Sequence, residues 1–108
     1  IHARDDDRVL FHGGSGSASN THADFVSVAD TVDKWVKLDA CRGPVQRQTD
    51  QPGVVCEVRS GCGGGAEVRL CVTDTGGHAW PGGRKALGGK GSNAMNATEA
   101  MWEFFGRQ

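Results

Sequence analysis

The chain has 108 residues, enough for one small domain with a modest core. Its 12 basic and 13 acidic side chains nearly cancel, so charge indicates neither a nucleic-acid face nor binding to an anionic membrane. No apolar run approaches the roughly 20 residues that span a bilayer, and the sequence does not open with a basic and apolar leader. We therefore expect no nucleic-acid or membrane partner, and we expect the gene product to extend upstream of Ile1.

Four cysteines are a high and even number for so short a chain, and they favour an oxidising, extracellular location for a secreted protein. They are Cys41, Cys56, Cys62 and Cys71. No pair has the C-x-x-C spacing, which argues against a zinc ribbon or a thioredoxin-like redox site. We expect disulfides and no metal site, and buried free thiols are the alternative.

The first half of the chain predicts one helix. Residues 1–11 are typical of a strand end followed by a loop, and residues 12–20 are rich in small polar residues, which predicts a loop or a flexible linker. The sequence Ser27-Val28-Ala29-Asp30 matches a capping box, and the apolar residues after it fall on one helical face. They are Val28, Ala29, Val32, Trp35 and Val36. The helix should end near residues 39–41, because Gly43-Pro44 cannot continue it.

The second half predicts a hairpin, a long loop and a terminal helix. Two β-rich runs, 54–58 and 67–72, flank the glycine cluster 61–65, which indicates a hairpin. Residues 76–91 are rich in glycine and predict a long loop of the kind that often carries function. Asn96 and Glu99 match another capping box, followed by an apolar helical face. Two strands and two helices cannot cover the apolar faces around Trp35, Trp102 and Phe105, so we expect a further segment to cover them.

His78 is the first candidate for chemistry. It follows the second predicted strand directly and lies in a glycine-rich run. A general base must lie within hydrogen-bond reach of the group that it deprotonates, and flanking glycines allow the sharp turn that brings the ring into a cleft. A surface or structural histidine is the alternative.

Several motifs together resemble the polyhydroxybutyrate depolymerase and feruloyl esterase family. They are the run 76–83, which reads Gly-Gly-His-Ala-Trp-Pro-Gly-Gly, the helix from Ser27, the Gly61-Cys62 turn and the ending 97–105. The resemblance covers essentially the whole chain, and members of the family are extracellular α/β-hydrolases. It implies an α/β fold class, in which residues 1–108 are the C-terminal portion of a single α/β-hydrolase catalytic domain with an incomplete sheet.

The resemblance also implies the site. His78 takes the place of the catalytic histidine and Asp6 that of the triad acid, in the order Ser, Asp, His of these enzymes. Asp5 and Asp7 are the competing acids. The alignment of the acid is weakened by three departures from the family pattern: Ala3 in place of glycine, Arg4-Asp5 in place of small residues, and Leu10 in place of proline.

The nucleophile is missing from the sequence. No G-x-S-x-G motif occurs, and Ser15 has glycine neighbours but lacks the strand, elbow and helix that expose a nucleophilic serine. We expect the serine and the oxyanion hole in an absent N-terminal half of the domain, so this chain alone should be inactive. Trp80 either forms a wall for an aromatic acyl group or a sugar ring, or packs its loop onto the body.

The cysteines pair as follows if the resemblance holds. It places Cys41 opposite Cys62, which leaves Cys56 and Cys71. A hairpin centred between Gly63 and Gly64 sets these two residues directly opposite each other, as a bridge or as a close pair of thiols.

The expected function of the parent protein is hydrolysis of a carboxylic ester, without a cofactor, through an acyl-serine intermediate. The candidates are a polyhydroxyalkanoate depolymerase and a feruloyl or acetylxylan esterase, so the partner is a polyester or a plant cell-wall ester. The alternative is a noncatalytic, secreted and disulfide-stabilised binding module that presents Trp80 to a carbohydrate or a partner. A G-x-S-x-G motif roughly a hundred residues upstream would favour the esterase.

Overall fold

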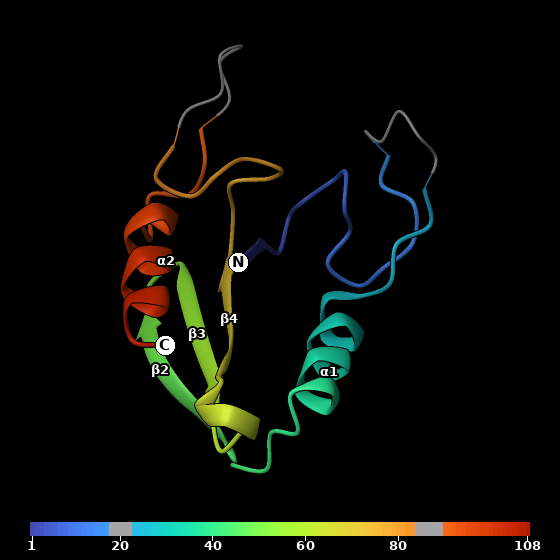
Figure 1. Ribbon diagram of the computed structural model, residues 1–108. Coiled ribbons are helices and arrows are strands. Elements are labelled where there is room, and N and C mark those ends of the chain that lie inside the picture. The colour runs from blue at the N-terminus through green and yellow to red at the C-terminus, as the bar shows by residue number, and fades with distance from the viewer. Residues whose placement is uncertain (18–22, 84–89) are drawn as a thin grey trace.

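The computed structural model describes residues 1–17, 23–83 and 90–108, and in these ranges the chain forms a four-stranded sheet with two helices (Figure 1). In chain order, the elements are β1 (His2–Ala3), α1 (Val28–Leu38), β2 (Val45–Gln51), β3 (Val54–Arg59), a 3₁₀ turn (Gly63–Gly65), β4 (Val68–Thr73) and α2 (Ala97–Gly106). The strand order is β1-β4-β3-β2. Strand β1 is parallel to β4, whereas β3 is antiparallel to both of its neighbours.

This sheet contradicts the expected fold class. The C-terminal portion of an α/β-hydrolase fold should carry mainly parallel strands, with helices as the crossovers between them. Here the described strands form a small mixed sheet in which β2, β3 and β4 are consecutive and antiparallel, and the parallel pairing of β1 with β4 is two residues long. The expectation of an incomplete sheet was right only in that the sheet is small.

Strand β2 is the element that the sequence did not predict. It reads Val-Gln-Arg-Gln-Thr-Asp-Gln, and six of its seven residues are exposed to solvent, Thr49 being half-buried. A strand at the edge of a sheet with both faces in water needs no alternation of apolar and polar residues, and such alternation is the usual sign of a strand. It pairs with β3 through backbone hydrogen bonds, and these do not depend on which side chains the strand carries.

The β3–β4 hairpin has the predicted register. Cys56 lies directly opposite Cys71, and the two are joined by a disulfide. Burial alternates along β3, with Val54, Cys56 and Val58 buried on one face. Ala94 and Met95, just before α2, pack against this face and form the small core with it.

Both helices begin at the predicted caps but leave large apolar side chains in water. The Ser27 hydroxyl accepts a hydrogen bond from the Asp30 N–H at 3.0 Å, and the side-chain Oδ1 of Asn96 accepts one from the Glu99 N–H at 3.1 Å. Figure 1 shows α2 alongside the β2–β3–β4 sheet and α1 on the other side of β4. Trp35 on α1 and Trp102 on α2 are both exposed, Trp102 by 82%.

The second disulfide joins Cys41 to Cys62 and so ties the end of α1 to the turn between β3 and β4. Both bonds link the cysteines in the expected pairs. Part of the expected loop 12–20, namely residues 18–20, and residues 84–89 of the glycine-rich loop lie outside the described residues. In the part of the chain that is described, neither helix has the length and apolar character to cross a membrane.

Candidate active site

The parallel pairing of β1 with β4 brings the two predicted chemical groups together. Ala3 pairs with Thr73, and the Arg4 N–H extends the ladder by donating to the Thr73 carbonyl at 2.8 Å. Parallel strands end at the same edge of a sheet. The segments that follow them, with Asp6 after β1 and His78 after β4, therefore meet at that edge although 72 positions separate them in sequence.

Asp6 forms the centre of the site. Its Oδ2 lies 2.9 Å from Nδ1 of His78, and its Oδ1 accepts hydrogen bonds from the backbone N–H groups of Arg8 and Val9, each at 2.9 Å. The residue is only 6% exposed. A buried carboxylate must have its oxygens satisfied by donors, and here both oxygens are.

The environment keeps Asp6 ionised. Burial by itself raises the pKa of the Asp6 carboxyl, because it penalises the charged form. The hydrogen bonds from the Val9 N–H, from His78 and from the Arg8 N–H, with the charge interaction with His78, act in the opposite direction and lower the pKa below its ordinary value. The carboxylate is therefore the form that faces His78 at neutral pH.

The two competing acids, Asp5 and Asp7, do not contact the imidazole of His78. The Oδ1 atom of Asp5 accepts a hydrogen bond from the Gly77 N–H at 2.8 Å, so this exposed side chain holds the backbone just before His78. Asp7 is exposed to solvent. Of the three adjacent carboxylates, the structure therefore places Asp6 at the imidazole and gives Asp5 a role in holding the loop.

His78 has one nitrogen on Asp6 and the other available. When Nδ1 carries the proton and donates it to Asp6, Nε2 has a free lone pair and can accept a proton. The side chain is 49% exposed, so this nitrogen can be reached. For His78 to act as a base, a hydroxyl group would have to come within hydrogen-bond distance of Nε2.

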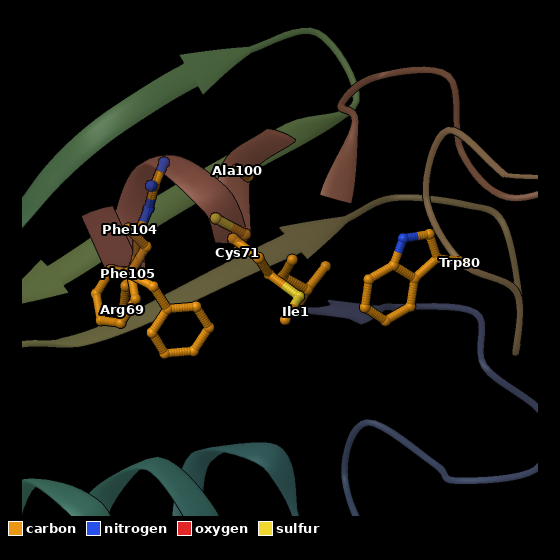
Figure 2. A pocket seen from close by; sticks show the side chains of 8 residues that line it. Ile1, Arg69, Cys71, Trp80, Ala100, Phe104 and Phe105 are labelled. Atoms are coloured by element: carbon orange, nitrogen blue, oxygen red, sulfur yellow. The ribbon is translucent and has the colours of Figure 1, made fainter. Parts of the chain in front are cut away.

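A cleft of about 390 Å³ lies beside this pair. It is lined by residues of the β1 end and of the loop after β4: Ile1, His2, Ala3, Asp6, Val9, Gly77, His78, Ala79, Trp80 and Pro81. A second hollow, of about 340 Å³, lies between β4 and α2 and shares Ile1 and Trp80 with the first. Figure 2 shows this second hollow with Trp80 at one end, Phe104 and Phe105 at the other, and Ile1 and Cys71 between them.

Trp80 lies where the two hollows meet. Its indole Nε1 donates a hydrogen bond to the Thr98 hydroxyl at 3.0 Å, which fixes the ring against the first turn of α2. The residue is nevertheless 52% exposed. Both sequence-based interpretations of Trp80 are thus compatible with its position, since it anchors the loop and about half of its surface stays exposed.

Glycine is required where the histidine loop crosses the segment before α2. The backbone of Gly76 has φ +115°, and a Cβ there would approach the Ser92 nitrogen to 2.5 Å. A Cβ on Gly91 would overlap the Trp80 carbonyl group. Only residues without a side chain allow the two segments to lie this close.

His2 is a site residue that the sequence did not reveal. Its Nε2 donates to the Val9 carbonyl at 2.8 Å and lies 3.6 Å from Oδ2 of Asp6. The sequence offered one signal, a histidine four residues before the acid, but nothing in its spacing predicts the contact with Val9. In the described ranges, no cluster of three or more metal-binding side chains occurs.

Comparison with known proteins gives one distant relationship to an esterase. The chain is 33% identical over 75 residues to feruloyl esterase B of Piromyces equi. This alignment covers 68% of the chain but only 14% of the length of that protein. No protein-family model matches the sequence, and no solved structure matches it. The two disulfides and the relationship to an esterase are consistent with an extracellular location.

Proposed function

We propose that this chain supplies the acid and the base of a carboxylic ester hydrolase, with Asp6 as the acid and His78 as the base. The observation that carries the proposal is the hydrogen bond of 2.9 Å between a buried carboxylate and a half-exposed imidazole at the edge of a cleft. The likeness to a feruloyl esterase supports it, although that alignment spans only 14% of the relative.

In the proposed reaction, His78 acts first as a general base and then as a general acid. Its Nε2 takes the proton of a serine hydroxyl as the serine oxygen bonds to the ester carbonyl carbon, and then gives the proton to the alcohol oxygen as the carbon–alcohol bond breaks. Water hydrolyses the acyl-serine by the same route. Asp6 keeps the proton of His78 on Nδ1 and stabilises the imidazolium that forms.

The serine in this scheme comes from a further segment of polypeptide. We propose that the same segment covers the apolar surface formed by Trp80, Trp102 and Phe105, which are exposed by 52%, 82% and 62%. Aromatic surface of this extent is usually covered in the working form of a protein. The proposed setting of the whole assembly is extracellular, in agreement with the two disulfides.

For the substrate, we propose an ester with an aromatic or other flat apolar acyl group. The open face of Trp80 lies in the cleft that holds His78, and it also lines the apolar hollow next to α2. Feruloyl esters of plant cell walls fit this description better than acetyl esters, which are too small to cover the indole. Polyester chains are the remaining candidate, and they would lie along the two neighbouring hollows.

The test compares the chain with the gene product that contains it, using methyl ferulate and a chromogenic short-chain ester. We expect the gene product to hydrolyse the esters and its His78→Ala variant to lose roughly 10³-fold or more in kcat. The 108-residue chain alone should show no turnover above its own His78→Ala variant, because it lacks the nucleophile and the oxyanion donors. An inactive gene product, or one indifferent to His78→Ala, would overturn the proposal.

A binding module is the second candidate, favoured by the open face of Trp80 and by the two disulfides. In this case, the chain should bind insoluble xylan or cellulose, and Trp80→Ala should abolish the binding while His78→Ala leaves it unchanged. Depletion of the chain from solution by the polysaccharide measures this directly. Binding that depends on Trp80, in a gene product without ester hydrolysis, would favour the module over the esterase.

A further inference from the structure

The loop that carries Asp6 is held by a series of hydrogen bonds that begins at another histidine. His2 Nε2 donates to the Val9 carbonyl at 2.8 Å, the Val9 N–H donates to Asp6 Oδ1 at 2.9 Å, and Asp6 Oδ2 accepts from His78 Nδ1 at 2.9 Å. Val9 is thus held through both its carbonyl and its N–H. The series links the two histidines through the acid.

One end of this series lies in the sheet, and the other lies in the loop that follows β4. His2 lies in β1 opposite Val72 of β4, and His78 follows the end of β4. The side chain of His2 is only 18% exposed, and its ring lies 6.1 Å from that of Phe11, which restricts its orientation. The segment between His2 and Val9 contains no helix or strand beyond β1, so its shape depends on such side-chain contacts.

The hydrogen bond to Val9 also defines which nitrogen of His2 is the donor. An imidazole nitrogen that faces a carbonyl oxygen must carry a hydrogen to form a hydrogen bond, so Nε2 of His2 carries one. The same nitrogen lies 3.6 Å from Asp6 Oδ2, beyond hydrogen-bond distance. His2 therefore does not compete with His78 for the Asp6 carboxylate. It instead holds the turn that surrounds this carboxylate.

We propose that His2 is a positioning residue that aims the Asp6 carboxylate at Nδ1 of His78. By holding the Val9 carbonyl, it fixes the Val9 N–H that binds Oδ1, and this leaves Oδ2 directed at the imidazole. The role rests on the proposed function in one respect, since the pair that it aligns matters for catalysis only if His78 is the base. The alignment itself can be measured without catalysis.

The test is the tautomer of His78, read from the ¹⁵N chemical shifts of its ring in the chain at a pH where the imidazole is neutral. A well-placed carboxylate at Nδ1 keeps the proton there, whereas an unassisted imidazole favours Nε2–H. In His2→Phe, which keeps a ring but has no donor, we expect the Nε2–H tautomer to rise several-fold. In His2→Gln, whose amide N–H can reach the Val9 carbonyl, we expect the native ratio to return.

Three further variants make the outcome decisive. His12→Phe is the matched control, because His12 is exposed and stacks edge-on against Phe11 without contacting Asp6, and it should leave the tautomer unchanged. Asp6→Asn should raise the Nε2–H tautomer of His78 whatever the role of His2. An unchanged tautomer in this variant would contradict the interaction of Asp6 with His78, and with it the proposed function. If His2→Phe does not fold, His2→Asn replaces it, because this shorter amide cannot span the distance to the Val9 carbonyl.

If the two tautomers of His78 keep their native ratio in His2→Phe while Asp6→Asn shifts it, the proposed role of His2 is overturned and the proposed function stays intact. Equal shifts in His2→Phe and His2→Gln would also overturn it, because the hydrogen bond to Val9 would then not be the cause. A shift in His2→Phe and a return in His2→Gln would support it.

Discussion

Asp6 is a carboxylate held almost out of water by three donors, two of them backbone N–H groups of its own turn. Charge-assisted hydrogen bonds of this kind are stronger than neutral ones, and a buried carboxylate without them would be costly. The turn and the acid therefore depend on each other. The same contacts that make Asp6 available to His78 also stabilise the fold around β1.

We predict that Asp6→Asn destabilises the chain by about 1–3 kcal/mol at neutral pH. The pKa of Asp6 lies below its ordinary value of 3.8 in the folded chain, so the ionised carboxylate stabilises the fold above that pH, and this contribution is lost as the pH falls through the folded pKa. The difference in Tm between the native chain and Asp6→Asn should thus be constant near neutrality and shrink in acid.

Thermal melts from about pH 7 to about pH 2.5 measure this difference. The matched control is Asp7→Asn, because Asp7 is the exposed neighbour, and it should change stability by no more than about 0.5 kcal/mol at any pH. An equal and pH-independent effect of the two substitutions would contradict the buried and hydrogen-bonded state of Asp6.

The chemical residues were predictable from the sequence to different degrees. His78 stands in a motif-rich loop after a strand, and Asp6 was chosen over its neighbours through the family resemblance. The contacts of His2 with Val9 and of Asp5 with Gly77 could not be predicted, because each depends on the path of an irregular turn. Hydrophobic periodicity, the main local signal in a sequence, contains no information about such turns.

The loop that carries His78 depends on close backbone packing. A side chain at Gly91 would overlap the Trp80 carbonyl group, whereas a Cβ at Gly106, at the end of α2, meets nothing within 4 Å. We predict that Gly91→Ala destabilises the chain by about 1–3 kcal/mol, because the Trp80 segment must move. Gly106→Ala should be neutral or stabilising by up to about 1 kcal/mol, since alanine favours the helix.

Chemical denaturation with urea measures both free energies of unfolding, and the tryptophan fluorescence of the folded state reports whether Trp80 has moved. Equal effects of the two substitutions would contradict the close approach of Gly91 to the Trp80 carbonyl group.

The two disulfides should stabilise different parts of the molecule. Cys56–Cys71 joins two paired strands within the core, whereas Cys41–Cys62 ties α1 to the β3–β4 turn, and α1 has no buried residue of its own. We predict that Cys41→Ser with Cys62→Ser increases amide exchange mainly in α1. Cys56→Ala with Cys71→Ala should instead lower the global free energy of unfolding by about 2–5 kcal/mol.

Hydrogen exchange resolved by residue separates these effects. The pairs of substitutions serve as controls for each other, because each removes one bond. If loss of Cys41–Cys62 exposed the amides of β3 and β4 as much as those of α1, the helix would be an integral part of the sheet rather than an element tied to it.

Among the elements, the sequence predicted both helices with their caps and the β3–β4 hairpin with its register. These have local signals: a capping residue before an apolar stripe, and two apolar runs around a glycine turn. Strand β2 was missed because its residues Val45–Gln51 are almost all exposed and polar. The fold class was wrong because it was inferred from the resemblance, whereas the described strands pair mainly antiparallel.

The whole molecule has a small core and a large exposed apolar surface. The core contains Val54, Cys56 and Cys71, with Ala94 and Met95 packed against it. Trp102 and Phe105 on α2 are exposed by 82% and 62%. Burial on this scale gives little stability without the disulfides, and the uncovered aromatic surface favours association.

We predict that the isolated chain binds a hydrophobic dye or self-associates, and that Trp102→Ser with Phe105→Ser reduces both. Dye fluorescence and sedimentation velocity over a range of concentrations measure these properties. Val45→Thr is the control, since Val45 is an exposed apolar residue that belongs to the edge strand β2 and not to α2. A native chain that stays monomeric at high concentration and binds no dye would contradict the proposal that a further segment covers this surface.

The central claim is that Asp6 and His78 act as one unit in ester hydrolysis, and a double-mutant cycle in the gene product tests it most directly. Residues that act as a unit give strongly non-additive losses, because removing the base already eliminates the benefit of its acid. We predict that kcat/KM for methyl ferulate in Asp6→Asn with His78→Ala equals that of His78→Ala alone. Losses that multiply, so that the double variant falls below His78→Ala by the full factor of Asp6→Asn, would contradict the claim.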